Sequence, residues 1–188
     1  MDDVALVHRP VLAGVETGTF GAMATGGLGV RLSAKPEGRL LHVLAAPGEQ
    51  SLRAELARQG VGAVRFVSPG QWLIASDEAA GPDVLAALAE LVGDRAAISD
   101  QSHGRVRIGL DGPRAADLLS KGTAVDLHPA AFPVGSSTAT LMGRIGVNLA
   151  RDGENAFELV VLRGFAESLW KDLVTMGLEY GIDCRGPV

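Results

Sequence analysis

Cysteine and aromatic residues are both scarce in this sequence. Cys184 is the only cysteine among 188 residues, so no intrachain disulfide can form, and this composition fits a reducing compartment. One tyrosine and two tryptophans are too few to build a platform on which nucleic-acid bases stack. The composition therefore indicates neither a disulfide framework nor a protein that binds single-stranded nucleic acid.

Positive charge and long apolar runs are also in short supply. The formal net charge is -5, whereas phosphate binding depends on clustered lysine and arginine. The first residues, MDDVALVHRP, carry two acids where a signal peptide would carry positive charge. The richest apolar runs, LLHVLAA and VLAALAELV, are much shorter than the roughly 20 residues that span a bilayer. We expect a cytoplasmic protein with no nucleic-acid or membrane partner.

From residue 39 onward the residue pattern is typical of a globular protein with both helices and strands. Hydrophobic residues make up 47% of the chain and charged residues 21%. The spacing of apolar residues in the first half predicts strands at 40–46, 61–67, 71–76 and 95–99, and helices at 48–60 and 81–94. In the second half it predicts strands at 105–110, 137–151 (one long or two short) and 157–162, and helices at 112–122 and 165–177.

This order of elements predicts an α+β fold made of two ferredoxin-like (split βαβ) units. We assign residues 39–102 to a first lobe and residues 103–188 to a second. Residues 1–38 include the Gly-rich stretch GVETGTFGAMATGGLGV, whose apolar periodicity is weak. We expect this segment to be an extended N-terminal arm that becomes ordered by lying across another subunit. It lacks the G-x-G-x-x-G pattern of a dinucleotide site.

Asp100, Ser102 and His103 are residue types that recur in hydrolytic triads. Here they lie within four residues of each other, and no G-x-S-x-G turn presents a nucleophile. We interpret Asp100 and Ser102 as residues that satisfy backbone donors at a turn before a strand.

Other candidate chemistry is equally sparse. The four histidines are scattered without ligand spacing to each other or to Cys184, and the P-loop pattern is absent. One basic cluster is present, formed by Arg105, Arg107, Arg114 and Lys121. It could be a solvated face, or it could contact an acidic partner surface. On the residues alone we predict no catalytic, cofactor-binding or metal-binding residue.

Three stretches carry a family resemblance: PGQWLIAS, DQSHGRVRIGLDGPRAADLLSKGTAVDLHPAAFPVG and AFELVVLRGFAESLWKDL. They resemble, in the same order, the sequence motifs of the gamma-subunit family of heterotetrameric sarcosine oxidase. The matching residues are 69–73, 102–135 and 157–173. The resemblance extends over residues 65–182. Its signature residues, which are also possible interface residues, are Trp72, Ser102, His103, Arg105, Gly112, Pro113, Lys121, Asp126, His128, Pro129, Phe132 and Trp170.

That family is in turn similar to the folate-binding fold of aminomethyltransferase, the glycine-cleavage T-protein. Where that fold has R-x-G-Y-T-G-E-x-G-F-E, this sequence has the shorter RDGENAFE at 151–158, and no G-G-I-x-D-D segment precedes it. These departures argue against independent folate binding by this chain.

The resemblance implies a non-catalytic gamma subunit with a structural or assembly role. The complex would demethylate sarcosine oxidatively to glycine, pass the one-carbon unit to tetrahydrofolate or release formaldehyde, and reduce oxygen to peroxide. FAD, FMN, NAD, tetrahydrofolate and zinc would lie on the partner subunits alpha, beta and delta, with the large alpha subunit as the chief partner. Exposed aromatic residues such as Phe132 would contribute to the interface.

Two alternatives remain open at this point. One is a subunit of a related N-methyl amino acid dehydrogenase. The other is a stand-alone T-protein-like folate-binding protein, such as the factors in iron–sulfur assembly. Those factors carry a functional cysteine in K-G-C-Y-x-G-Q-E, whereas Cys184 lies in IDCRGPV.

Overall fold

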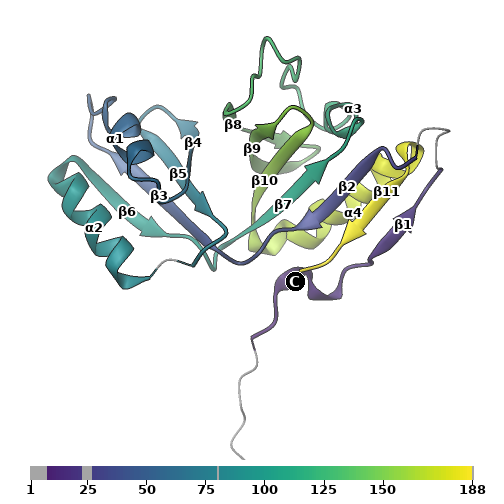
Figure 1. Cartoon of the computed structure of the whole chain (residues 1–188), viewed down its shortest axis with the longest axis horizontal. Helices are drawn as coiled ribbons and strands as arrows, with labels where there is room; N and C mark the ends of the chain where they lie inside the picture. Colours follow the sequence, from purple (N-terminus) through teal and green to yellow (C-terminus); the bar gives the residue numbers. More distant parts are fainter. Residues whose placement is uncertain (1–7, 23–26, 80, 188) are drawn as a thin grey trace, which may run out of the picture.

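The computed structural model describes residues 8–22, 27–79 and 81–187. Two β-sheets form the framework of these residues, and their planes diverge from a common junction to give a V-shaped molecule (Figure 1). All strands of the smaller sheet come from residues 39–100, and those of the larger sheet come from before residue 35 and after residue 104. The α+β class predicted from the sequence is confirmed, whereas the lobe boundaries at 38 and 102 stay a prediction.

The smaller sheet is antiparallel throughout, with the order β4-β5-β3-β6. Its helices pack on one face, where Trp72 and Ile74 meet Leu56 and Leu88 in a shared core. The elements are β3 (Arg39–Ala45), α1 (Leu52–Arg58), β4 (Ala63–Ser68), β5 (Gln71–Ser76), α2 (Pro82–Val92) and β6 (Ala96–Asp100).

Helix α2 begins and ends where the sequence predicts. Pro82 occupies its first turn, where its missing N–H is not needed. Gly93 ends it with a φ of 50°, a conformation that favours glycine. Helix α1 is shorter than the predicted 48–60, because residues before Leu52 form turns instead.

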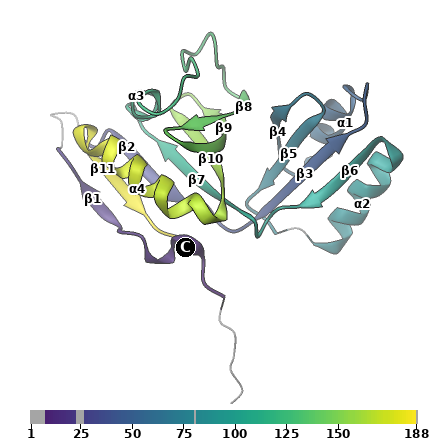
Figure 2. The ribbon, with the colours of Figure 1, turned by 180° about the vertical axis from the view of Figure 1, so that it is seen from behind.

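The larger sheet has seven strands in the order β1-β11-β2-β7-β10-β9-β8. Helices α3 and α4 cover one face, and Figure 2 shows α4 lying across it. Its elements are β1 (Gly18–Phe20), β2 (Val30–Ala34), β7 (Arg105–Asp111), α3 (Ala115–Ser120), β8 (Ser137–Met142), β9 (Ile145–Gly153), β10 (Ala156–Leu162), α4 (Ala166–Gly177) and β11 (Ile182–Arg185). Single 3₁₀ turns are η1 (Val11–Gly14), η2 (Gly93–Arg95), η3 (Arg163–Phe165) and η4 (Leu178–Tyr180).

Strand β2 corrects part of the prediction that residues 1–38 form an extended arm ordered by another subunit. It lies inside the larger sheet, parallel to β11 and antiparallel to β7, and Val30 and Leu32 are buried. Its five residues, VRLSA, alternate apolar and polar side chains, but this run is short and sits between Gly29 and Pro36. Residues 30–34 are therefore ordered by their own chain rather than by a partner. Residues 1–7 and 23–26 of the predicted arm lie outside the described residues.

The faces of the two sheets that carry no helix meet at the junction of the V. Leu40, Leu73 and Ala75 from the smaller sheet pack against Val160 of β10 in a small separate core. The lobes are thus joined by a layer of side chains between two sheet faces. In the described part of the chain, no helix has the length and apolar character needed to span a membrane.

Candidate functional site

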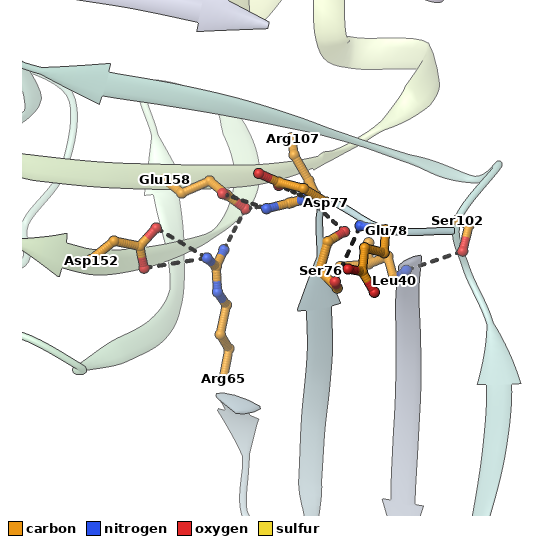
Figure 3. Close-up of polar contacts among 9 residues, drawn as sticks. All are labelled: Leu40, Arg65, Ser76, Asp77, Glu78, Ser102, Arg107, Asp152 and Glu158. Atoms are coloured by element: carbon orange, nitrogen blue, oxygen red, sulfur yellow. Dashed lines mark hydrogen bonds and ion pairs between the residues drawn. The ribbon is translucent and has the colours of Figure 1, made fainter. Parts of the chain in front are cut away.

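The three triad-type residues build a turn, as the sequence predicts. The Ser102 backbone N–H donates to Asp100 Oδ1 over 2.8 Å, and the Ser102 hydroxyl donates to the same oxygen over 2.6 Å. Ser102 Oγ in turn accepts the Leu40 backbone N–H at 3.0 Å (Figure 3). The Ser102 hydroxyl hydrogen bond is the largest cause that lowers the pKa of Asp100. His103 is exposed, and Asp100 and Ser102 connect β6 to β3 instead of activating a nucleophile.

Three of the four histidines have local partners in the described residues. His42 Nε2 lies 3.2 Å from Gln71 Oε1, and His128 Nδ1 accepts the Ala130 N–H. His8 pairs with Glu37. Over 8–22, 27–79 and 81–187, no group of three or more histidine, cysteine, aspartate and glutamate side chains is placed to hold a metal ion.

A buried ion-pair network crosses the junction between the lobes, centred on Glu158 of β10. Both Glu158 oxygens accept hydrogen bonds from Arg107 of β7, from Nε over 2.8 Å and from Nη2 over 2.9 Å. Arg65 of β4, in the other lobe, donates to Glu158 Oε1 over 2.6 Å. The side chains are only 1% (Glu158), 5% (Arg65) and 9% (Arg107) exposed. Three strands of two lobes therefore meet at one carboxylate (Figure 3).

Outer partners complete this network. Arg65 Nη2 also donates to Asp152, with distances of 3.1 and 3.3 Å to its two oxygens. Arg107 Nη1 donates to the Ser76 carbonyl and pairs with Asp77, both at 2.8 Å. Asp152 and Asp77 are about half exposed, so water screens their attraction to the arginines. Both arginines thus share the buried carboxylate of Glu158, and each also pairs with one outer carboxylate of its own.

The protonation of Glu158 follows from these contacts. Burial by itself would raise its pKa, but the hydrogen bonds from Arg107 and the charge of Arg65 outweigh burial and lower the pKa below its ordinary value. Glu158 is therefore ionised near neutral pH and balances part of the arginine charge. Buried arginines without such a partner would be strongly destabilising.

The network corrects one interpretation of the basic cluster. Arg107 is not on a solvated face, because it is buried against Glu158. Arg105 is half-buried at the edge of the junction, whereas Arg114 and Lys121 are exposed and lie over the Tyr180 ring at 4.8 and 4.3 Å. The four cations therefore do not act as one surface.

The remaining signature residues lie in structural positions. Trp72 and Trp170 are buried in the cores of the smaller and larger sheets. Gly112 has a φ of 126°, and a Cβ there would lie 2.5 Å from the Gly29 carbonyl oxygen. Pro113 follows it at the start of the α3 turn and is exposed, and Lys121 donates to the Met176 carbonyl of α4.

The segment between α3 and β8 holds four more signature residues: Asp126, His128, Pro129 and Phe132. Asp126 Oδ1 accepts the His128 N–H over 2.9 Å. Arg151 of β9 holds the segment in place, because its Nη1 donates hydrogen bonds to the carbonyls of Leu127 and Phe132 over 3.1 and 3.0 Å. Phe132 was expected to be exposed, and this is wrong: it is 6% exposed and belongs to the larger core.

A family model described as "Sarcosine oxidase, gamma subunit family" matches residues 42–179. The chain belongs to this family. The gamma subunit of sarcosine oxidase from Corynebacterium sp. (strain U-96) is 31% identical over 143 residues, which cover 68% of this chain and 69% of that protein. The resemblance found in the sequence is confirmed.

Solved structures agree with this family. A chain of the heterotetrameric sarcosine oxidase from Corynebacterium sp. U-96, in complex with pyrrole 2-carboxylate, superposes with a TM-score of 0.68 at 28% identity. The match covers 78% of this chain and 83% of that one. Glycine cleavage system aminomethyltransferase T from Bartonella henselae shares the fold, with a TM-score of 0.57 at 15% identity over 90% of this chain and 56% of that one.

Proposed function

We propose that the chain is the non-catalytic gamma subunit of a heterotetrameric, flavin-dependent sarcosine oxidase. The family match over residues 42–179, together with the structural match to 83% of a chain of such an enzyme, carries this proposal. Its signature residues shape turns and cores of the described chain, which is what an assembly subunit requires. The large alpha subunit is the chief partner, and beta and delta complete the complex.

The chemistry of the complex lies on the other subunits in this proposal. They hold FAD, FMN, NAD, tetrahydrofolate and zinc, and they oxidise sarcosine in the cytoplasm. The purified chain should therefore be colourless and should not turn over sarcosine alone. An absorbance spectrum with flavin bands, or peroxide production by the isolated chain, would contradict this part of the proposal.

Glu158 also supports an assembly role over stand-alone folate binding. It ends the RDGENAFE stretch that aligns with the aminomethyltransferase motif, and both of its oxygens are engaged by arginines of two lobes. A carboxylate that accepts three arginine hydrogen bonds and is only 1% exposed is not accessible to a pterin ring. We expect no saturable tetrahydrofolate binding by the isolated chain in calorimetry.

We further propose that both lobes, at 39–102 and 103–188, are split βαβ units of the aminomethyltransferase type. The strand order of the smaller sheet has this form. The larger sheet fits it when β1, β2 and β8 are treated as additions, since β11, β7, β10 and β9 then keep the required order.

Co-expression tests the subunit assignment. The alpha, beta and delta subunits of the same source should be produced with and without this chain carrying an affinity tag. The expected result is a co-eluting complex with sarcosine-dependent peroxide formation, and a loss of yield or integrity when this chain is left out. A tagged chain that elutes alone, beside an intact and active complex of the other three, would overturn the proposal.

A further inference from the structure

A groove opens between the lobes beside the ion-pair network. Its volume is about 280 Å³, and its lining comes from both sheets. His42, Val67 and Leu73 line it from the smaller sheet. The larger sheet contributes Arg105, Asn148 and Leu162. The groove therefore lies next to the small core between the two sheet faces, where side chains no longer fill the space between the sheets.

Two polar groups in this lining have no hydrogen-bond partner among the described residues. Asn148 is 4% exposed, and its amide donates to the Phe66 carbonyl over 2.7 Å, but its Oδ1 is unsatisfied. Arg105 Nε is likewise buried and unsatisfied. Burial lowers the pKa of Arg105, and no carboxylate of the described chain counters it. Buried polar groups without a hydrogen-bond partner destabilise the free chain, so a ligand that satisfies them gains affinity.

Exposed leucines continue the groove on both sheet faces. In β10, Leu162 pairs with Arg105 and is 46% exposed. In β8, Leu141 pairs with Gly146 and is 57% exposed. Leu44 is 40% exposed and follows His42 on the same face of β3. Large apolar side chains that line an open sheet face are typical of a surface covered by another protein.

We infer that this groove binds an acidic and apolar peptide segment of another subunit of the complex. The inference rests on the proposed function. A peptide offers the complementary groups together: a carboxylate for Arg105, a backbone N–H for Asn148 Oδ1, and apolar side chains for Leu44, Leu141 and Leu162. A small carboxylate ligand would satisfy Arg105 but would leave the leucines in water.

The single cysteine of the chain makes a labelling test possible. Cys184 is buried, and burial raises its pKa to about 11, so it reacts slowly with maleimides near neutral pH. The variant Leu162→Cys places one reactive thiol at the groove, and Glu90→Cys places one on the exposed face of α2 as the matched control. Labelling rates are then compared between the free chain and the purified complex.

Protection of the thiol at 162 is the expected result. Its labelling should slow by about tenfold or more on assembly, since a covered thiol reacts only when the complex opens. The thiol at 90 should be labelled at the same rate in the free chain and in the complex, which shows that the reagent is active in both samples. Equal labelling of the thiol at 162 in the free chain and in an assembled complex would overturn the inference.

Charge variants test the acidic character of the occupant. Arg105→Glu should weaken assembly by about tenfold or more, which corresponds to about 1.4 kcal/mol. Arg105→Lys keeps the charge but removes the buried Nε–H, so it should assemble less tightly than the unaltered chain and more tightly than Arg105→Glu. Arg53→Glu on the exposed face of α1 is the control for charge reversal alone. Equal affinity of Arg105→Glu and Arg53→Glu would contradict an acidic occupant.

Other occupants give different outcomes. Slower labelling of the free chain in the presence of sarcosine or acetate would assign the groove to a small carboxylate and overturn the inference. Slower labelling of the free chain at high protein concentration would assign it to a second copy, with the same consequence. If the unaltered chain fails to assemble, the proposed function falls and this inference with it. If it assembles and leaves the thiol at 162 unprotected, only the inference falls.

Discussion

Replacing Glu158 by glutamine should uncouple the two lobes. The variant keeps the shape of the side chain but removes the charge that Arg65 and Arg107 share. Removal of one partner from a buried ion pair costs about 3–5 kcal/mol, because an uncompensated charge stays buried. Asp152 and Asp77 still reach these arginines from half-exposed positions, so we expect a loss of about 3 kcal/mol in the free energy of unfolding.

The two tryptophans provide the assay. Trp72 is buried in the core of the smaller sheet and Trp170 in that of the larger sheet, so each reports on one lobe. Trp170→Phe and Trp72→Phe backgrounds isolate the two fluorescence signals. With a urea dependence of about 2 kcal/mol per molar, the loss corresponds to a midpoint lower by about 1.5 M.

The two signals also distinguish coupling from general damage. In the unaltered chain, the tryptophans should report one transition, whereas in Glu158→Gln the two midpoints should separate. Glu167→Gln, on the exposed side of α4, is the matched control and should change neither midpoint. Midpoints for Glu158→Gln that equal those of this control would refute a structural role for the network.

Three further predictions concern stability, and the second of them also uses sarcosine turnover by the complex. The pKa of Glu158 is lower in the folded chain than its unfolded value of about 4.3. Its stabilising contribution is therefore present above the unfolded pKa and is lost as the pH falls through the folded pKa. The difference in the free energy of unfolding between the unaltered chain and Glu158→Gln should accordingly shrink at acid pH. Ser102→Ala removes the acceptor of the Leu40 N–H and should lower the free energy of unfolding by about 1 kcal/mol. Ser102→Ala and His103→Ala should each leave sarcosine turnover by the complex within about tenfold. A loss of several powers of ten with the fold intact would show that the turn is catalytic. Gly112→Ala should cost at least about 1–2 kcal/mol, since φ is 126° and the new Cβ meets the Gly29 carbonyl; no change would mean that the backbone relaxes freely there.

Strong periodicity made most of the fold predictable from the sequence. Strands β3, β7 and β10 and helices α2 and α4 carry long apolar patterns, and each lies where its pattern predicts. Strands β2 and β11 are only five and four residues long, and both depend on the sheet that surrounds them. Their partners lie far away in the sequence, so local patterns could not place them. Strand β2 owes its position to pairing with β7 and β11.

The site was harder to predict, because its residues come from distant strands. Glu158 interrupts an apolar strand, FELVVL, and an acid in such a place requires a partner when it is buried. That signal indicates that a cation is near, but it does not say which one. Arg65 is 93 residues away from Glu158 in the sequence. The alternation of Arg105 and Arg107 along RVRIGL predicted one shared polar face, but the junction buries Arg107 and leaves Arg105 at its edge.

This difference between two arginines on the same strand face links the internal architecture to the interface. Arg105 and Arg107 lie two residues apart on β7 and therefore point to the same side of the sheet. Arg107 meets Glu158 of β10, whereas Arg105 lies at the start of β7 beside the β6–β7 connection, and no carboxylate of the described chain reaches its guanidinium. The placement of acids around β7 thus satisfies Arg107 within the chain and leaves Arg105 for the acidic occupant that we propose for the groove. Because residues of both lobes line the groove, a Glu158→Gln change that uncouples the lobes should also weaken assembly there, although Glu158 itself is buried and does not line it.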